Sequence, residues 1–315
     1  MKYIESFREG EGINDIYLVR SKKSDITKTG KPYDKLVLSD RTGSVDAMIW
    51  DPNSAGIDDF DALDYVCVNA VVNNYQGANQ LNIKRVRKCS EGEYDPSDYL
   101  PVSEKNIDEM WASLTAYIDG IGNRYLKQLL DAFFGDAEFA AKFKKSSAAK
   151  AVHHGFVGGL LEHTLSVTNM CDYYSKAYPM LNRDLLLTAA MLHDIGKTRE
   201  LSDFPQNDYT DEGQLLGHIV IGAHMAMEKM DAIEGFPQKL YSEVTHCILA
   251  HHGEYEFGSP KKPAIMEAVA LHFADNTDAK METMKEIFKA TTDDGWLGFN
   301  RLIESNIRKT SVSDD

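Results

Sequence analysis

The stretch DLLLTAAMLHDIGK, Asp184–Lys197, decides how the second half of this 315-residue chain folds. Its first part is apolar on nearly every face of a helix, so we expect that helix to run through the centre of a bundle. His193 and Asp194 follow at its end, and burying such a polar pair costs free energy unless a partner such as a cation compensates it. Gly196 is expected to let the chain turn at once, leaving Lys197 near the same place. The stretch therefore predicts a metal site inside a helical domain.

Four further candidate ligands lie in other stretches that have the composition of buried helices: His163, His218, His251 and Asp275. Metal sites in helical bundles are built this way, with one inward ligand from each of several helices. Imidazole and carboxylate without thiolate suit Mn, Fe, Co or Zn, with Mg a weaker fit. The alternative for any single histidine is an ordinary core or surface residue. Their recurrence in order on separate helices favours a site for one or two ions, which the two oxygens of Asp194 are suited to bridge.

Residues 103–310 show a helical period throughout, which predicts a single all-α domain. Ser103 is the expected N-cap of its first helix, and Gly120 is expected to end that helix. Further helices are expected at 122–134, 136–145, 158–177, 184–195, 216–232, 238–252, 264–290 and 295–306. No strand pattern returns in this region, so we expect a helical bundle behind a separate N-terminal domain.

Residues 1–95 have the pattern of an all-β domain. Five short stretches are rich in β-branched and aromatic residues: Asp15–Arg20, Tyr33–Leu38, Ser44–Trp50, Tyr65–Val72 and Gln80–Val86. Turn residues separate them, and the first three form a meander before a longer connection. This is typical of a five-stranded OB-like barrel, although an SH3-like barrel has a similar pattern. Residues 96–102, which include PSDYLP, are the expected linker.

The charge is strongly acidic, with 34 Lys and Arg against 49 Asp and Glu and a net charge of −15. As a whole this argues against a general nucleic-acid-binding protein, which needs basic side chains against phosphate. Divided after residue 95, however, the first part carries −3 and the remainder −12. An acidic site is compatible with a polyanionic substrate when divalent cations lie between them. Four cysteines without CxxC spacing, no secretory signal and no long apolar run indicate reduced thiols, a cytoplasmic location and no membrane partner.

Aromatic and basic residues of the first domain are candidates for binding a single strand, because bases stack on aromatic rings beside a basic track. The candidates are Tyr33, Lys35, Trp50, Tyr75, Lys84 and Arg85, with Tyr17 a further available ring. The alternative is that the rings form the core of a small barrel and the lysines are merely solvated. The prediction therefore concerns the region rather than any one residue.

The order H…HD…D, with GGLLEHT at 158–164 and HDIGK at 193–197, resembles the HD-domain metal-dependent phosphohydrolase superfamily. The resemblance implies that the four metal-binding positions correspond to His163, His193, Asp194 and Asp275. It implies His218 and His251 as additional ligands of two-metal members, with His252 as a neighbour, and Lys197 as a basic residue facing substrate phosphate. On this pattern the HD core spans about residues 150–290.

A small barrel followed by an HD domain further resembles the YhaM-type 3′→5′ exoribonucleases. The stretches that carry the likeness are VNNYQGANQLNIKRVR, AVHHGFVGGLLEHTLSV, DEGQLLGHIVIGAH and ILAHHGEYEFGSPKKP. The resemblance implies a barrel that binds single-stranded RNA, and a hydrolase, typically manganese-dependent, that releases nucleoside 5′-monophosphates from the 3′ end. Binding of single-stranded DNA and assembly into a homo-oligomer are left open.

In the expected mechanism, metal-activated water attacks the terminal phosphodiester. Asp194, Lys197, His153 and His154 are the candidate catalytic residues, the last three for holding phosphate or protonating the leaving oxygen. For His153 and His154 the alternative is a surface helix end. Two other functions stay open: a nucleotidase or cyclic-nucleotide phosphodiesterase with a regulatory barrel, and a non-catalytic DNA- or RNA-binding factor.

Overall fold

The chain divides into two compact units, Met1–Pro101 and Val102–Asp315, each with a hydrophobic core of its own. The computed structural model describes residues 1–75, 77–95, 98–100, 102–150, 155–289, 291 and 295–311. Residues 96, 97 and 101 of the expected linker therefore lie outside the described residues.

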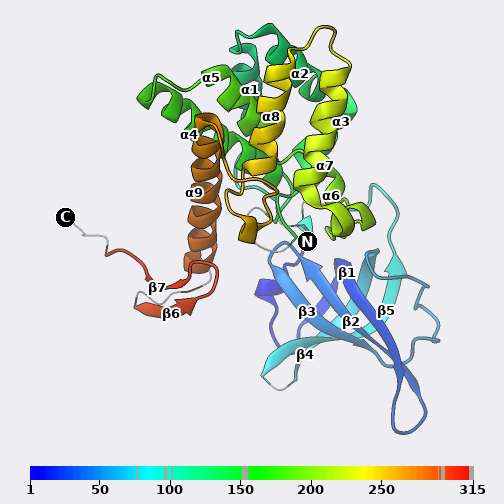
Figure 1. Cartoon of the computed structure of the whole chain (residues 1–315). Coiled ribbons are helices and arrows are strands. Elements are labelled where there is room, and N and C mark those ends of the chain that lie inside the picture. The colour runs from blue at the N-terminus through cyan, green and yellow to red at the C-terminus, as the bar shows by residue number, and fades with distance from the viewer. Residues whose placement is uncertain are drawn as a thin grey trace. The chain divides into compact units, whose positions relative to one another are not determined.

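The first unit is a closed barrel of five strands in the order β1-β2-β3-β5-β4 (Figure 1). The strands are β1 (Gly12–Ile26), β2 (Pro32–Asp40), β3 (Gly43–Ile49), β4 (Tyr65–Tyr75) and β5 (Ala78–Lys88). Neighbouring strands are antiparallel except β3 and β5, which pair in parallel and close the barrel. A three-stranded meander closed in this way is the Greek-key barrel of the OB-fold. The predicted OB-like domain and its five strands are confirmed.

Alternating side chains fill the interior of the barrel. On β2, Leu36 and Leu38 are buried, whereas Lys35, the residue before Leu36, is exposed. Tyr17 of β1 is also fully buried, and its hydroxyl donates a hydrogen bond of 2.6 Å to the carbonyl oxygen of Lys2. The ring of Tyr17 therefore belongs to the core, and its proposed availability for stacking was wrong.

The second unit is a helical bundle, as predicted. Its helices are α1 (Ile107–Asp119), α2 (Arg124–Phe134), α3 (Ala137–Lys145), α4 (Gly159–Ala177), α5 (Arg183–Leu192), α6 (Lys197–Glu200), α7 (Asp211–Asp231), α8 (Gln238–Ala250) and α9 (Met266–Lys289). Helix α5 is the central one: every residue from Leu185 to Leu192 is buried, and the helix packs against α4, α8 and α9. A helix that is apolar all round has to be enclosed in this way.

The start of α1 differs from the prediction. Its N-cap is Asn106, whose side-chain oxygen accepts hydrogen bonds from the backbone N–H groups of Asp108 and Glu109. The hydroxyl of Ser103 instead donates to the carboxylate of Glu162 on α4. The same hydroxyl accepts the backbone N–H of Lys105 at 3.0 Å, which lies before the helix, and the N-cap is three residues later than predicted. Gly120 ends the helix as expected.

The helix expected at 295–306 was wrong, because this segment is a β-hairpin of β6 (Trp296–Asn300) and β7 (Ser305–Arg308). Gly298 and Glu304 have φ values of +85° and +56°, which a right-handed helix does not accept. The side chain of Asn300 accepts hydrogen bonds from the N–H groups of Leu302 and Ile303 and so forms the turn. Figure 1 shows the hairpin after the end of α9.

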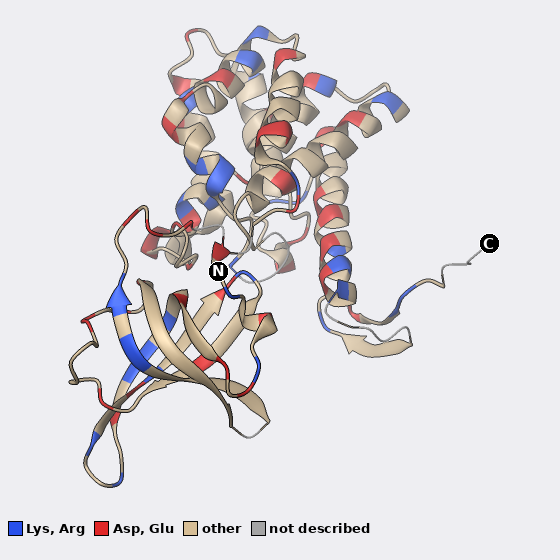
Figure 2. Ribbon diagram, turned by 180° about the vertical axis from the view of Figure 1, so that it is seen from behind, with Lys and Arg blue, Asp and Glu red and all other residues tan. Residues whose placement is uncertain are grey.

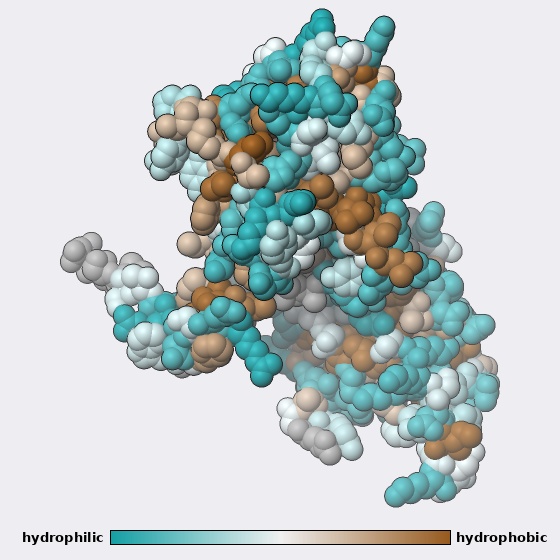
Figure 3. All heavy atoms as spheres, in the orientation of Figure 1, coloured by the Kyte–Doolittle hydropathy of each residue, from teal (hydrophilic) through white to brown (hydrophobic). Residues whose placement is uncertain are grey.

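Charged and apolar side chains are distributed unevenly over the surfaces of the two units. Acidic residues are spread over the helices, and basic residues lie along strands of the barrel (Figure 2). Hydrophobic side chains reach the surface near the start of α9, where Tyr178, Met180, Met266 and Phe273 line a groove of about 560 Å³ (Figure 3). The four cysteines are free. None of the described helices is long and apolar enough to cross a membrane.

Candidate metal centre

The end of α5 places His193 and Asp194 in the middle of the bundle, where both are almost wholly buried. The chain turns at residues 193–196 as expected, but Gly196 has a φ of −62°, an ordinary right-handed value, so the turn does not need a left-handed glycine. Its role is close approach: a Cβ atom there would lie 2.1 Å from the carbonyl oxygen of His218. The glycine lets the connection between α5 and α6 contact the backbone of α7, and this contact brings His218 towards Asp194.

One set of ligand atoms comes from His163 on α4, His193 after α5 and Asp275 on α9, all within 4.8 Å of one another. The Nε2 atoms of the two histidines are 3.2 Å apart. Oδ1 of Asp275 lies 3.2 Å from Nε2 of His163 and 3.9 Å from Nε2 of His193. We call these three residues the first set.

A second set consists of His218 on α7 with His251 and His252 at the end of α8, again within 4.8 Å. Helix α7 is kinked at Gly217, whose φ of +73° breaks the helical hydrogen bonding. The kink frees the backbone N–H of His218, which donates to Oε1 of Glu200 at 3.0 Å, and Nδ1 of the same ring lies 2.9 Å from that oxygen. A single carboxylate thus fixes both the backbone and the ring of His218.

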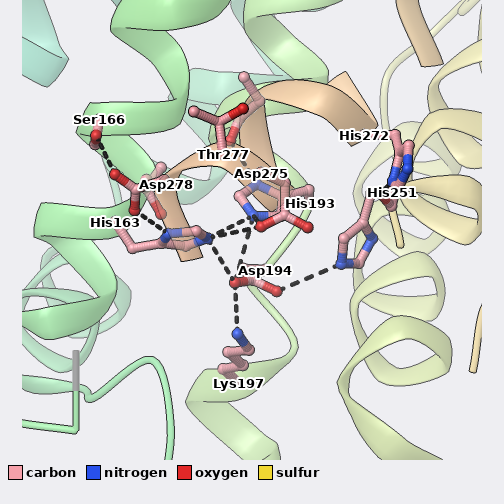
Figure 4. A network of polar contacts seen from close by, with 12 residues as sticks. His163, Ser166, His193, Asp194, Lys197, His251, His272, Asp275, Thr277 and Asp278 are labelled. Carbon is pink, nitrogen blue, oxygen red and sulfur yellow. Dashed lines mark hydrogen bonds and ion pairs between the residues drawn. The ribbon is translucent and has the colours of Figure 1, made fainter. Parts of the chain in front are cut away.

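Asp194 lies between the two sets and offers one oxygen to each. Its Oδ2 is 3.4 Å from Nε2 of His163 and 3.3 Å from Nε2 of His193. Its Oδ1 is 3.6 Å from Nε2 of His218 and 3.7 Å from Nε2 of His251. Figure 4 shows Asp194 between His163 and His251. One carboxylate is therefore available to both sets.

Every histidine of the two sets has its Nδ1 atom hydrogen-bonded to an oxygen on the side away from Asp194. The acceptors are Asp278 for His163, the Ala190 carbonyl for His193, Glu200 for His218, the Ile248 carbonyl for His251 and the Phe257 carbonyl for His252, at 2.7–2.9 Å. An oxygen acceptor requires the N–H to be at Nδ1, so the lone pair of each neutral ring is at Nε2. Such outer partners are the usual companions of metal-binding imidazoles.

Three buried atoms at the centre lack a hydrogen-bond partner among the described residues: Oδ1 of Asp194, Nε2 of His218 and Nε2 of His251. Polar atoms that are buried without partners are rare because they lose their hydration. All three atoms are Lewis bases that converge on one position, and a cation is the partner they have in common. The residues therefore fit a divalent metal, which is the chemistry predicted from the sequence.

The electrostatics of the first set also favour a positive charge. Burial acts to lower the pKa of His163, but the carboxylates of Asp194, Asp275 and Asp278 outweigh it and hold the pKa well above its usual range. In the second set, burial and the neighbouring imidazoles hold the pKa of His251 well below its usual range. That ring is therefore neutral, with a lone pair at Nε2 for a metal ion. Metal binding requires neutral imidazoles, and it would displace the proton from His163.

Lys197 reaches the same centre from the start of α6. Its Nζ lies 2.7 Å from Oδ2 of Asp194. Burial acts to lower the pKa of Lys197, but the charge of Asp194 outweighs it and the pKa is raised. The lysine also lines a cavity of about 450 Å³ whose wall includes His163, His252 and Asp275. A permanent positive charge therefore lies where the cavity meets both ligand sets.

The six predicted ligands are brought together, with His252 beside them. His153 and His154, the other predicted catalytic residues, lie outside the described residues. Two carboxylates were missed: Asp278 and Glu200, which hold His163 and His218. Asp278 had a signal, since it lies three residues after Asp275 and therefore on the same face of α9. Glu200 had none, because its partner is reached only through the kink of α7.

On the barrel, most of the predicted strand-binding residues share the outer face of β2, β3 and β5. The rings of Tyr33 and Trp50 are 5.7 Å apart, and 53% of Trp50 is exposed. Lys35 forms an ion pair with Asp46 at 3.0 Å. Lys84 and Arg85 lie on β5 just beyond the residues that pair with β3. Tyr75 lies apart, at the end of β4, where it lines a cleft of about 250 Å³ between β3 and β5.

Comparison with known proteins agrees with this centre. A family model described as HD domain matches residues 160–280. The 3′-5′ exoribonuclease YhaM of Bacillus velezensis is 35% identical over 276 residues, which are 87% of each chain. The protein of the same name from Bacillus subtilis is 36% identical over 280 residues, also 87% of each chain.

Among solved structures, the second OB-fold domain of replication protein A from Methanococcus maripaludis is 16% identical, with a TM-score of 0.24. That match covers 30% of this chain and 98% of that one. The barrel assignment rests on its own strand order, and the family assignment on the long sequence matches. Since the identity exceeds one third and extends through both units, the chain belongs to the family of the YhaM 3′-5′ exoribonucleases.

Proposed function

We propose that this hydrolytic enzyme is a metal-dependent 3′→5′ exoribonuclease that shortens single-stranded RNA and releases nucleoside 5′-monophosphates. The observation that carries the proposal is the position of Asp194, with one oxygen towards each of two histidine-containing sets. Two adjacent cations suit phosphodiester hydrolysis, in which charge develops on both the attacking and the leaving oxygen. The name of the YhaM relatives supports RNA as the substrate and the 3′ end as the point of attack.

The residues of the first set, with Oδ2 of Asp194, would hold one ion, and the second set with Oδ1 would hold the other. Bound there, divalent ions supply positive charge for the phosphoryl oxygens and activate water for attack. Lys197 adds a fixed ammonium group at the same place, suited to hold a phosphoryl oxygen. Hydrolysis breaks the bond between phosphorus and the 3′ oxygen of the preceding nucleotide, so the phosphate leaves on the 5′ carbon of the released one.

Manganese is the metal we propose, because the two sets and the Asp194 between them offer imidazole and carboxylate donors and no thiolate. Elemental analysis of protein purified without chelator tests this. Manganese at one or two equivalents supports the proposal, whereas zinc or iron as the main metal contradicts it.

The barrel is proposed to capture the single strand, with RNA as its main ligand and single-stranded DNA as a further one. The half-buried ring of Tyr33 and the exposed ring of Trp50, on the outer face that also carries Lys84 and Arg85, support this, since stacking and phosphate contacts do not depend on the sugar. Self-association is supported by the apolar groove beside α9. A cytoplasmic location stays a prediction.

The test uses one single-stranded RNA labelled either at its 5′ end or at its 3′ end, with Mn²⁺ and the full-length protein. An exoribonuclease of this direction produces a ladder from the 5′-labelled strand and immediate release of labelled mononucleotide from the other. Asp194→Ala should abolish shortening and leave strand binding intact. The matched control is Asp203→Ala, an exposed aspartate away from both sets, which should keep full activity.

The same experiment separates the two other functions. Hydrolysis of a small cyclic or free nucleotide without any shortening of the strand would indicate a phosphodiesterase or nucleotidase with a regulatory barrel. Strand binding without hydrolysis of either substrate would indicate a binding factor with a structural metal. Activity that survives Asp194→Ala contradicts a mechanism built on the shared carboxylate.

A further inference from the structure

The cavity over the metal centre extends beyond the ligand sets. Its wall also includes Asn276 and Lys280 on α9, Leu302 on the hairpin, and Phe257. Among the described residues of this wall, Phe257 is the only phenyl, phenol or indole ring. At about 450 Å³ the cavity lies in the size range of pockets that enclose one small ligand.

The connection between α8 and α9 (Figure 1) contains the 3-10 segment η3 (Tyr255–Phe257), whose last residue is Phe257. The residue is 63% exposed, so its ring is available to a ligand in the cavity. The carbonyl oxygen of the same residue accepts the Nδ1–H of His252 at 2.8 Å. The backbone that carries the ring is therefore tied directly to an imidazole of the second set.

Further hydrogen bonds hold this turn in place. The N–H of Phe257 donates to the carbonyl oxygen of Glu254 at 3.1 Å, and the N–H of Gly258 donates to that of Tyr255 at 3.0 Å. Gly258 has a φ of +85°, which ends the turn in a conformation that favours glycine. Lys262 forms an ion pair with Glu254. These contacts fix the backbone that carries the ring of Phe257, in the wall of the cavity that His163, Lys197 and Asp275 also line.

We propose that Phe257 forms a nucleobase subsite, on which the base of the 3′-terminal nucleotide stacks while its 5′ phosphate lies at the two ligand sets. The inference rests on the proposed function and deepens it. A nucleotide has a flat base and an anionic phosphate. The exposed ring of Phe257 offers a stacking partner for the base, and the positive charge in the same cavity offers a partner for the phosphate. Because every base has a π-face, the subsite accepts all four bases.

A neighbouring ring provides the matched comparison. Tyr255 lies on the same turn and is 59% exposed, but it is not part of the cavity wall, and the ammonium of Lys262 lies 5.5 Å from its centre. If exposure on this turn were all that mattered, the two rings would be equivalent. The proposal requires that only Phe257 contributes to binding the base.

The experiment measures kcat/KM with Mn²⁺ on two RNA strands of equal length, one intact and one with an abasic ribose at its 3′ end. Phe257→Leu keeps the bulk and removes the aromatic face, Phe257→Trp keeps that face, and Tyr255→Leu is the control. Stacking of one base corresponds to about 5- to 150-fold in affinity. Phe257→Leu should lower kcat/KM by about that factor on the intact strand and leave the abasic strand unchanged. Phe257→Trp and Tyr255→Leu should resemble the wild type on both.

The outcomes distinguish this inference from the proposed function. A wild type that shortens the intact strand, together with a Phe257→Leu variant that loses nothing or loses equally on both strands, overturns the subsite and leaves the function in place. A comparable loss in Tyr255→Leu overturns it as well. A wild type that shortens neither strand overturns the proposed function, and the subsite falls with it.

Discussion

Glu200 should control only one of the two metal positions. Its Oε1 accepts hydrogen bonds from Nδ1 and from the backbone N–H of His218, at 2.9 and 3.0 Å. Both of these bonds come from the second set, and neither involves a residue of the first set. Burial acts to raise the pKa of Glu200, but the bonds from His218 outweigh it and the pKa is lowered, so the group is ionised at neutral pH. Glu200→Gln keeps the shape and one acceptor oxygen and removes the charge.

The size of the effect follows from this geometry. Loss of an outer partner of a metal-bound imidazole lowers metal affinity by about 10- to 100-fold, which is about 1.4–2.8 kcal/mol. Because only His218 depends on Glu200, the whole loss should fall on the second set. The first set keeps Asp275, the shared Asp194 and the support of Asp278, so its affinity should stay within about twofold.

Calorimetric titration of metal-free, full-length protein with Mn²⁺ measures both affinities. We expect two binding steps in the wild type and, in Glu200→Gln, one unchanged step and one weakened step. Glu212→Gln is the matched control, because that side chain is partly exposed and pairs only with Arg199, at 3.6 Å, among the described contacts. Equal weakening of both steps, or no weakening of either, would refute the division into two sets. A single binding step in the wild type would refute it too.

Three further changes have expected outcomes. Gly196→Ala forces a Cβ into the backbone of α7 and should lower the free energy of unfolding by about 1–3 kcal/mol or more, measured by urea denaturation. Lys280→Ala removes a positive charge from the cavity wall and should reduce the slope of log KM against log salt by about 0.7 for a single strand. Burial raises the pKa of Asp172, but ion pairs with Lys176 and Arg183 outweigh it and lower the pKa. Asp172→Asn should therefore cost about 1–3 kcal/mol at pH 7, and less as the pH falls through the lowered pKa.

Each of these has an outcome that contradicts it. Gly120→Ala, at an exposed helix end, should be tolerated, and equal damage from both glycine changes would show that close approach to α7 is not the cause. An unchanged salt slope would place Lys280 away from the strand. A difference between wild type and Asp172→Asn that stays constant from pH 7 to pH 2 would mean that the ion pairs do not stabilise the fold.

Much of the two sets could be predicted because a polar side chain stands in an otherwise apolar stretch at several of their positions. His193 and Asp194 end a helix that is apolar all round, and such a pair has few explanations besides a cation. The same pattern marks His163 and His251. These positions can be recognised from the sequence alone, because the polar residue and its apolar neighbours belong to the same helix.

The missed features depend on contacts between segments. Glu200 binds the backbone N–H of His218 only because α7 is kinked at Gly217. No local sequence pattern shows which carboxylate will accept from that N–H. The hairpin at residues 296–308 was missed for a different reason. Its apolar residues have helical spacing by chance, and the decisive information is the left-handed backbone at Gly298 and Glu304. A glutamate in that conformation cannot be foreseen from its propensity.

The closed barrel has a consequence for recognition. A sheet that closes on itself, with β3 pairing to β5, leaves open edges only where a strand extends past one of its partners, as at residues 21–26 of β1, which pair with β2 alone among the described strands. A ligand on the closed part of the barrel has to contact side chains of its outer face, because the main-chain groups there are already paired. Contacts of that kind distinguish poorly among bases. An enzyme that shortens a strand from its end meets every base in turn. A surface without a preference for one base binds and releases the strand equally well at each step.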